Sequence, residues 1–380
     1  MDRRPPLERP TTSGWRAMVG ADPVPWLLSS PEPAARWVAL TGLSGAGPED
    51  DDVRSAHRAV VTDPATRSIV TRLLDWTHDQ HLSGHQSPAF GPHLLGLLAD
   101  MGVVADDFPE VELTLDAMLA HQEATGRFPS FGTAAPGAGP VWGALLCDTH
   151  PVLDVLLRFG RADDPRVRRA LARSANDLGD TAQGRAWSCL PHPVTGWRGP
   201  GRRDAVCPMT TLQALRAFSR VDAAHRPDGV LDAARVVLRA WRERGSEKPY
   251  QFGHGVHFKT VKWPPTWYDA YAVVDTVGRF PALWRDDPTG ADARSIAEIV
   301  ACLVAYNVSP DGTVTPRSTY RGFEAHSFGQ KKQPSPFATA LLLTALRRVE
   351  DLAPEVVRVD VGALGSSKGG SGTPVGSRVR

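Results

Sequence analysis

Apolar residues recur at helical spacing in six segments of the chain, separated by more polar stretches. Apolar positions three and four residues apart predict an α-helix in each segment. Most of the segments start with a proline, which suits the first turn of a helix because its missing N–H would have no partner there. The starts lie roughly 55–70 residues apart, a period long enough for two helices and a loop. The six segments begin at Pro33, Pro88, Cys147, Pro208, Pro264 and Pro334.

A second kind of segment lies between them and carries charged residues on one face. Several of these segments open with Asp–Pro or a similar start signal, and an acid in the first turn complements the helix dipole. No region shows the sustained alternation that marks a β-strand. The chain therefore alternates apolar and amphipathic helices along its length. The amphipathic segments cover residues 63–77, 108–122, 164–177, 231–244 and 291–307.

This alternation predicts an all-α protein built as an (α/α)6 toroid. Six inner helices would line the centre, and about six outer helices would wrap around them. An open helical solenoid obeys the same repeat logic. We favour the closed ring because the loops before the apolar helices are long and irregular. Such loops can converge on one mouth, as functional loops do on a rigid scaffold.

Composition narrows the class of protein. The chain has 380 residues, 42% of them hydrophobic, and a net charge of +1. No general attraction to nucleic acid or membranes follows from that charge. We expect a single domain over residues 15–362, between disordered ends at 1–14 and 363–380. Four cysteines do not make a disulfide framework, and no apolar run reaches about 18 residues. These features predict a cytoplasmic protein with no transmembrane segment and with reduced thiols.

Two stretches carry a family resemblance. Residues 196–218 read GWRGPGRRDAVCPMTTLQALRAF, and residues 310–349 read PDGTVTPRSTYRGFEAHSFGQKKQPSPFATALLLTALRRV. Their pattern resembles the repeats of the terpenoid cyclase and protein prenyltransferase β-subunit superfamily. More narrowly, the chain resembles prokaryotic "prenyltransferase/squalene oxidase repeat" proteins, over most of residues 30–350. The resemblance implies an α/α toroid and an isoprenoid substrate.

The chain departs from both branches of that superfamily in its chemical motifs. The Asp-X-Asp-Asp acid motif of class II cyclases does not occur. The Asp-X-Cys zinc pair of the prenyltransferases has its nearest counterpart in Asp204-Ala-Val-Cys207, which is one residue too long. The resemblance therefore predicts the fold more specifically than the reaction.

Three cysteines flank neighbouring helices of the predicted ring. Cys147, Cys189 and Cys207 would meet at one rim, with Asp148 and Asp204 close by in sequence. Thiolates and carboxylates are ligands that Zn²⁺ accepts, so zinc is the cofactor we consider. A thiolate of lowered pKa could instead act as a nucleophile. The third interpretation is that the thiols are buried packing residues.

Basic residues precede three successive apolar helices. If the ring closes, they converge on one side of the mouth and could bind an anion, because guanidinium and ammonium groups recognise phosphates. The alternative is an ordinary solvated surface. The candidates for this substrate-binding rim are Arg198, Arg202, Arg203, Lys259, Lys262, Lys331 and Lys332.

An aromatic segment before the fifth helix completes the candidates. Residues 250–269 hold Trp267, Tyr268 and Asp269 among further aromatic residues. Aromatic ring faces attract cations, so such a cup suits an apolar or carbocationic ligand. Tyr268 and Asp269, expected in the first turn of that helix, could serve as acid or base, as could Asp148 and Asp204. Aromatic core packing is the alternative. His85, before the second helix, is a secondary binding candidate.

The sequence therefore favours a prenyltransferase-like or terpenoid-cyclase-like enzyme that binds an isoprenoid diphosphate in a central cavity with a basic, cysteine-containing rim. Its partner would be an anionic small-molecule or lipid substrate rather than nucleic acid. Two rivals fit the same fold. One is a polysaccharide-lyase-like toroid acting on anionic sugars, and the other is a non-enzymatic lipid-binding or interaction module.

Overall fold

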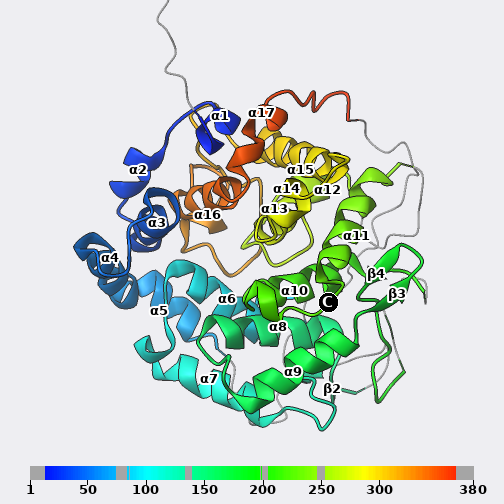
Figure 1. Ribbon diagram of the computed structural model, residues 1–380. Coiled ribbons are helices and arrows are strands. Elements are labelled where there is room, and N and C mark those ends of the chain that lie inside the picture. The colour runs from blue at the N-terminus through cyan, green and yellow to red at the C-terminus, as the bar shows by residue number, and fades with distance from the viewer. Residues whose placement is uncertain are drawn as a thin grey trace, which may run out of the picture.

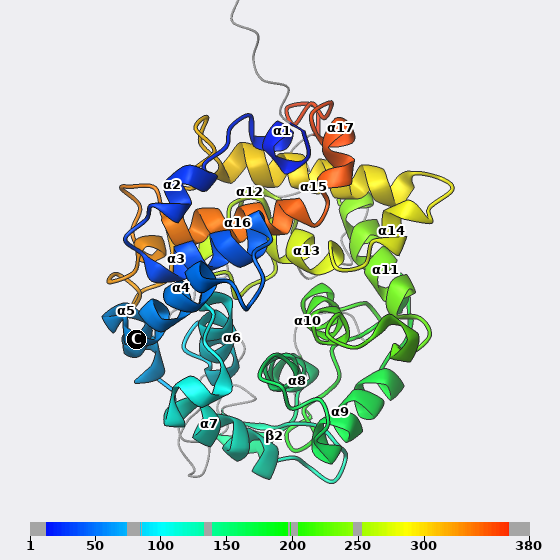
Figure 2. The same cartoon turned by 60° about the vertical axis from the view of Figure 1, so that its left-hand side comes forward.

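Six helices form a closed inner ring, as the alternating pattern predicted. The computed structural model describes residues 13–73, 84, 86–132, 139–196, 198, 204–245 and 253–364. Each inner helix packs against the next, and the last packs back on the first (Figures 1 and 2). The inner helices are α3 (Pro33–Val38, continued by a π-helical turn at Ala39–Ser44), α6 (Gly91–Met101), α8 (Leu146–Arg158), α10 (Pro208–Phe218), α13 (Ala270–Val277) and α16 (Pro336–Arg347).

Amphipathic helices surround this ring, so the protein is an all-α toroid (Figure 1). In α9, for example, only Val167, Ala170 and Ser174 are buried, whereas every residue of α13 is buried. The larger outer helices are α4 (Asp51–Thr62), α5 (Pro64–Val70), α7 (Pro109–Ala120), α9 (Pro165–Asn176), α11 (Val230–Arg242) and α15 (Ala291–Asn307).

Short elements fill the remaining space. The short helices are α1 (Trp15–Val19), α2 (Val24–Leu28), α12 (Val256–Lys259), α14 (Ala282–Arg285) and α17 (Ala353–Val356). The pairs β1–β2 (Ser130–Gly132, Val141–Gly143) and β3–β4 (Gly179–Thr181, Gly184–Ala186) are antiparallel, and β5–β6 (Lys262–Trp263, Ser318–Thr319) is parallel. No described helix has the length and apolar character needed to cross a membrane.

The starts of three inner helices differ from the sequence prediction by two residues or more. The largest difference is in α13, which begins at Ala270 rather than Pro264. Two successive prolines disfavour helical geometry in the residue before each of them. The helix starts only where the side chain of Asp269 accepts a hydrogen bond from Ala272 N at 2.8 Å. Tyr268 and Asp269 therefore precede the first turn. Similarly, α6 starts at Gly91 and α16 at Pro336, after the cap Ser335.

Side-chain hydrogen bonds join the two ends of the ring. Glu32, the residue before α3, accepts a hydrogen bond from Ser327 Oγ at 2.7 Å and one from Phe337 N, in the first turn of α16, at 3.2 Å. At the other end of the same two helices, Arg347 donates to the carbonyl of Gly42 at 2.7 Å. Residues about 300 positions apart in the chain are thus bonded at both ends of the α3–α16 contact.

Removing the Glu32 side chain tests this closure. Glu32→Ala should lower the free energy of unfolding by about 1–3 kcal/mol, because the Phe337 amide loses its partner. The matched control is Glu355→Ala in the exposed part of α17, which should stay within about 0.5 kcal/mol of the wild type. Urea unfolding measures both. Equal stabilities for the two variants would show that the Glu32 bonds do not hold the ring closed.

Candidate functional site

A cavity partly open to solvent lies inside the ring, and the space within it, open solvent included, is about 700 Å³. Its walls come from α6, α8, α10 and the loop that leads into α13. The apolar part of the wall includes Leu97, Val155, Met209, Leu212 and Trp267. Concave pockets lined by apolar side chains with a few polar groups are the usual form of small-molecule sites.

The two ends of the cavity differ in polarity. The end near the helix N-termini is lined by Trp267 and four prolines, together with the polar side chains of His93 and Thr266. The prolines are Pro92, Pro151, Pro264 and Pro265. The end near the helix C-termini is polar and is lined by Asp100, Asp154, Arg158, Gln213 and Arg216. Along α10, the rise from Met209 to Arg216 is roughly 10 Å. A long ligand would thus meet an apolar wall along most of its length and charged groups at one end.

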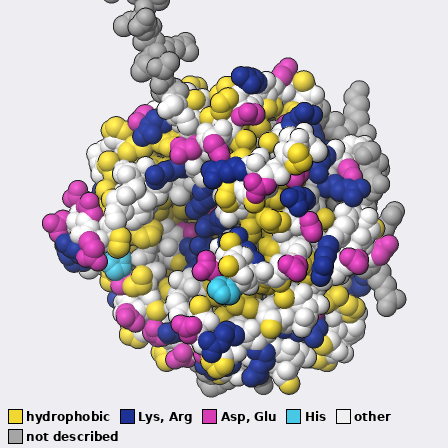
Figure 3. Space-filling view, viewed as in Figure 1, with side chains coloured by type: hydrophobic (Ala, Val, Ile, Leu, Met, Phe, Trp, Pro, Cys, Tyr) yellow, Lys and Arg dark blue, Asp and Glu magenta, His cyan; other side chains and the backbone are white. Residues whose placement is uncertain are grey.

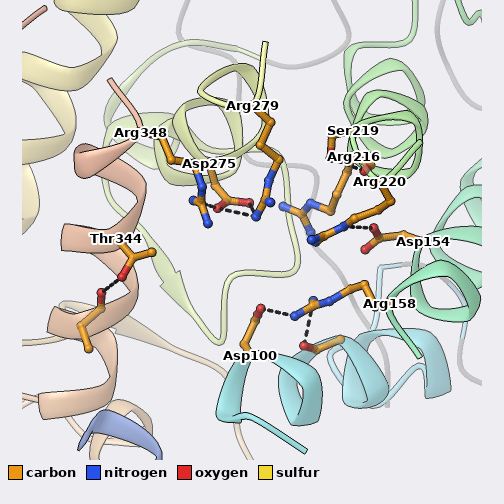
Figure 4. Close-up of polar contacts among 12 residues, drawn as sticks. Asp100, Asp154, Arg158, Arg216, Ser219, Arg220, Asp275, Arg279, Thr344 and Arg348 are labelled. Carbon is orange, nitrogen blue, oxygen red and sulfur yellow. Dashed lines mark hydrogen bonds and ion pairs between the residues drawn. The ribbon is translucent and has the colours of Figure 1, made fainter. Parts of the chain in front are cut away.

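The polar end belongs to a larger group that we call the arginine cluster (Figure 4). Its members come from the last turns of five inner helices or from the residues just after them. Each outer helix returns the chain in the direction opposite to the preceding inner helix. The inner helices are therefore parallel to one another, and their C-terminal ends lie at the same end of the ring. The cluster consists of Asp100, Asp154, Arg158, Arg216, Arg220, Asp275, Arg279 and Arg348.

Ion pairs join most members of the arginine cluster. Arg158 donates to Asp100 at 2.6 Å and also to the carbonyl of Gly96 at 3.0 Å. Arg220 donates to Asp154 at 3.2 Å. Asp275 accepts hydrogen bonds from both Arg279, at 3.2 Å, and Arg348. These pairs tie the C-terminal ends of α6, α8 and α10 together in one group and those of α13 and α16 in another.

Burial and mutual attraction set the charges of the cluster. Burial alone would raise the pKa of the Asp275 carboxyl, but Arg279, Arg348 and Arg216 hold it well below its usual range. Burial lowers the pKa of Arg279 to about 10, against the pull of Asp275. Both groups are therefore charged at neutral pH. Five arginines then face three aspartates, which leaves a surplus of positive charge.

Arg216 has no ion-pair partner in the part of the chain that the structure describes. Its Nε is buried without a hydrogen-bond partner, and its guanidinium group lies between the Asp154–Arg220 pair and the pairs around Asp275 (Figure 4). Burial opposes its charge, but the more distant Asp275, Asp154 and Asp100 raise its pKa overall. Lys and Arg side chains also gather around the hollow at the centre of the face in Figure 3. The centre of the ring is thus basic.

The three cysteines proposed at the rim lie within electrostatic reach of one another. Burial, then Asp148, Cys207 and Cys189, raise the pKa of the Cys147 thiol well above its usual range. Burial also raises the pKa of Cys207. These shifts disfavour an activated thiolate. Among the described residues, no group of three or more His, Cys, Asp or Glu side chains is placed to hold a metal ion. The described cysteines therefore do not fit a zinc site, and no step proposed below uses one.

The basic residues predicted at the loop rim lie outside the cavity wall where the structure describes them. Lys259 is buried, with its ammonium group 5.4 Å from the centre of the Tyr306 ring. Lys262 is exposed over the Tyr320 ring, and burial, then the nearby Lys331, lower its pKa. Lys332 is exposed and Arg198 is partly buried. Arg202, Arg203 and His85 lie outside the described residues.

The predicted acid and base residues are dispersed. Tyr268 is buried in an aromatic cluster, where its hydroxyl lies 3.2 Å from His254 Nε2. Asp148 is buried in the first turn of α8, and Asp204 is exposed in the turn before α10. Asp269 is buried. Trp267, two residues before it in the chain, and Ala272, three residues after it, line the cavity. Of the predicted site residues, Trp267 is the one in the described cavity wall.

The arginine cluster was missed at the sequence level, although a signal for it exists. Five of the apolar segments carry charges near their ends, in the strings LLADMG, LDVLLRFG, LQALRAFSR, VVDTVGR and LTALRR. A cation in the last turn of a helix is an ordinary partner of the helix dipole, so each string alone is unremarkable. Their recurrence in five copies, on helices predicted to be parallel, is the signal.

Comparisons with known proteins bear on the fold. No protein-family model matches the chain, and no curated protein does. Among solved structures, a protein from Actinoplanes is 14% identical over 83% of this chain and 89% of its own, with a TM-score of 0.39. The type II terpene cyclase MstE from Scytonema, a variant in complex with its substrate geranylgeranyl dihydroxybenzoate, is also 14% identical, over 85% of this chain and 87% of its own, with a TM-score of 0.39. At such low similarity, the toroid rests on the packing of the chain's own helices.

The buried carboxyl of Asp269 predicts a pH-dependent stability. Burial raises its pKa to about 7, although Ala272 N and Arg216 oppose the shift. Between about pH 4 and 7 the folded protein therefore holds a proton that the unfolded chain has lost, so this group makes the fold less stable as pH rises. Asp269→Asn keeps a capping side chain without the titration. Its stability advantage over the wild type should grow by roughly 4 kcal/mol at most between pH 4 and pH 7.

Urea unfolding of both proteins across this pH range provides the measurement. Only the difference between them is informative, because burial also lowers the pKa values of His150, His254 and His326 to about 4. Those histidines destabilise the fold as pH falls, equally in both proteins. A constant difference between the two proteins would mean that Asp269 has an ordinary pKa.

Proposed function

We propose that the protein is a terpenoid-cyclase-like enzyme that holds an isoprenoid chain in its central cavity with the anionic head group at the basic end. The observation that carries the proposal is the polarity of the cavity, which is apolar along its walls and basic at one end. An isoprenoid diphosphate has the same division, with a hydrocarbon tail and a multiply charged head.

The apolar wall supports a hydrocarbon ligand over a sugar. Leu97, Val155 and Leu212 offer no hydrogen bonds, and burying hydroxyl groups against them would cost free energy. Uronate sugars, the ligands of the lyase alternative, would lose hydration along this wall without gaining polar partners. Burial of an isoprenoid tail in the same place is favourable by about 25 cal/mol for each Å² of apolar surface removed from water.

The end of the cavity opposite the arginine cluster supports protonation of the substrate. The ring of Trp267 lies in the wall there, and the buried carboxyl of Asp269 follows it in the chain. Because burial raises the pKa of Asp269 to about 7, this carboxyl retains a proton near neutral pH. In the proposed reaction Asp269 gives its proton to a distal double bond of the substrate. The alkene π electrons form the new C–H bond, and the resulting carbocation is stabilised by the Trp267 ring.

The rest of the reaction follows from the charge of that cation. A second double bond attacks the cation and closes a ring. A carbon next to the cation then loses a proton to water in the partly open cavity, and the C–H electron pair forms a double bond. Asp269 regains a proton from solvent, and the hydrocarbon part of the diphosphate is again uncharged. The diphosphate is retained throughout. Prenyl transfer, the other reaction considered, would instead break the bond to the diphosphate, which would leave with the electron pair.

Filling the cavity tests ligand binding. Leu212→Trp places a large ring in the apolar wall and should weaken binding of geranylgeranyl diphosphate by at least about tenfold. The matched control is Leu113→Trp on the exposed face of α7, where Leu113 is 69% exposed. Calorimetric titration measures both affinities, and thermal unfolding confirms that both variants are folded. Equal affinity in the two variants would place the ligand elsewhere.

Turnover separates the candidate functions. The protein is incubated with geranyl, farnesyl and geranylgeranyl diphosphates, and products are identified by mass spectrometry. A cyclised diphosphate of unchanged mass supports the proposal, and its formation should fall at least about 100-fold in Asp269→Asn. Free diphosphate as a product would favour prenyl transfer, cleavage of uronate oligomers would favour the lyase, and binding without product would favour a lipid-binding module.

A further inference from the structure

Most arginines of the arginine cluster have a structural partner. Arg158, Arg220, Arg279 and Arg348 each form an ion pair with one of its aspartates. Arg158 also donates to the carbonyl of Gly96 in the middle of α6, which satisfies part of its hydrogen-bonding capacity. These four residues are explained by the fold, because cations at helix C-termini are stabilising.

Arg216 is not explained in this way. Its Nε is buried and has no hydrogen-bond partner, and it forms no ion pair with another described residue. A buried charge without a partner costs free energy, and here four other guanidinium groups surround it. Nevertheless its position in the wall of the cavity leaves one side of the group accessible to a ligand. A group of this kind is what an anion-binding site presents before the anion arrives.

The charge of the arginine cluster indicates the kind of anion. Five arginines against three aspartates leave a surplus of two positive side-chain charges, which the partial negative charges of the helix C-termini reduce. Asp269, at the other end of the cavity but within electrostatic reach of Arg216, would add one negative charge if ionised, and the side-chain surplus would still be positive. Gln213 lies one turn before Arg216 in the same wall, and its amide nitrogen can donate a further hydrogen bond. A phosphate or diphosphate group has the matching negative charge and several acceptor oxygens. Guanidinium groups bind such oxygens through bidentate hydrogen bonds.

We infer that the C-terminal ends of the inner helices form a phosphate-binding site, centred on Arg216, that takes the diphosphate of the substrate. The inference rests on the proposed function for the identity of the ligand, and it locates the head group away from the loop rim that the sequence suggested. Arg216 bonds the anion directly. The four paired arginines keep their aspartate partners and add attraction at longer range.

The test compares Arg216→Met with Arg168→Met, a matched change at an exposed arginine of outer helix α9. Inorganic pyrophosphate is titrated calorimetrically into each protein at fixed ionic strength. The loss of one charge-assisted contact should weaken pyrophosphate binding by roughly 10- to 100-fold in Arg216→Met. Arg168→Met should bind as the wild type does. Unchanged affinity in Arg216→Met, or no pyrophosphate binding by the wild type, would overturn the inference.

Thermal unfolding without ligand distinguishes a binding role from a structural one. If Arg216 serves only the fold, Arg216→Met should lower the melting temperature, as Arg220→Met should, because the latter leaves Asp154 buried without its partner. If Arg216 serves to bind an anion, the Arg216→Met variant should have the same melting temperature as the wild type or a higher one. A melting temperature as low as that of Arg220→Met, with unchanged pyrophosphate affinity, would assign Arg216 to the fold.

Two further ligands distinguish failure of this inference from failure of the proposed function. Geranylgeraniol has the tail without the charge, and geranylgeranyl diphosphate has both. If the alcohol binds and Leu212→Trp weakens it, but Arg216→Met does not affect the diphosphate ester, the cavity binds isoprenoids and the anion site is wrong. Pyrophosphate binding could instead depend on Arg216 while geranylgeranyl diphosphate binds no tighter than pyrophosphate. In that case the anion site is correct and binds a free phosphate compound, and the proposed isoprenoid function is wrong.

Discussion

The structure depends on closing the ring of inner helices. Every residue from Phe337 to Leu343 in α16 is buried, so this helix needs neighbours on all sides. The contact between α16 and α3 supplies the neighbour that each would lack in an open array. Closure also forces parallel helices to bring their ends together. The cavity and the arginine cluster are both consequences of this one packing constraint.

The fold was accessible from the sequence because burial leaves a strong periodic pattern. The pattern places apolar helices in the inner ring and amphipathic helices, with one solvent-exposed face, outside it. The structure confirms both placements. Boundaries were less accessible. The apolar pattern predicts that the fifth inner helix starts at Pro264, but capping by Asp269 after the Pro–Pro pair decides the start. That decision depends on local backbone geometry, which apolar periodicity does not report.

The site was less accessible for a different physical reason. Sequence reasoning placed charged function in the loops, where most functional residues of rigid scaffolds lie. It did place Trp267 beside the cavity. The arginine cluster lies within helices instead, and each of its cations taken alone is an ordinary helix C-terminal residue. Its distribution of charge depends on which arginines form ion pairs with an aspartate. Most of these pairs join different helices, so they form only in the assembled ring. Arg220 pairs with Asp154, whereas Arg216, one turn earlier, has no such partner among the described residues.

The bonds between Glu32 and α16 have a consequence for the synthesis of the protein. The first inner helix leaves the ribosome about 300 residues before the helix that covers it. At 5–20 residues per second, that interval is roughly 15 seconds to one minute. During this time one apolar side of α3 faces water or a chaperone, and the nascent chain can only be an open arc of helix pairs. The ring exists only once translation is nearly complete, so a truncated chain lacks both its closing contact and the arginine that α16 contributes to the centre.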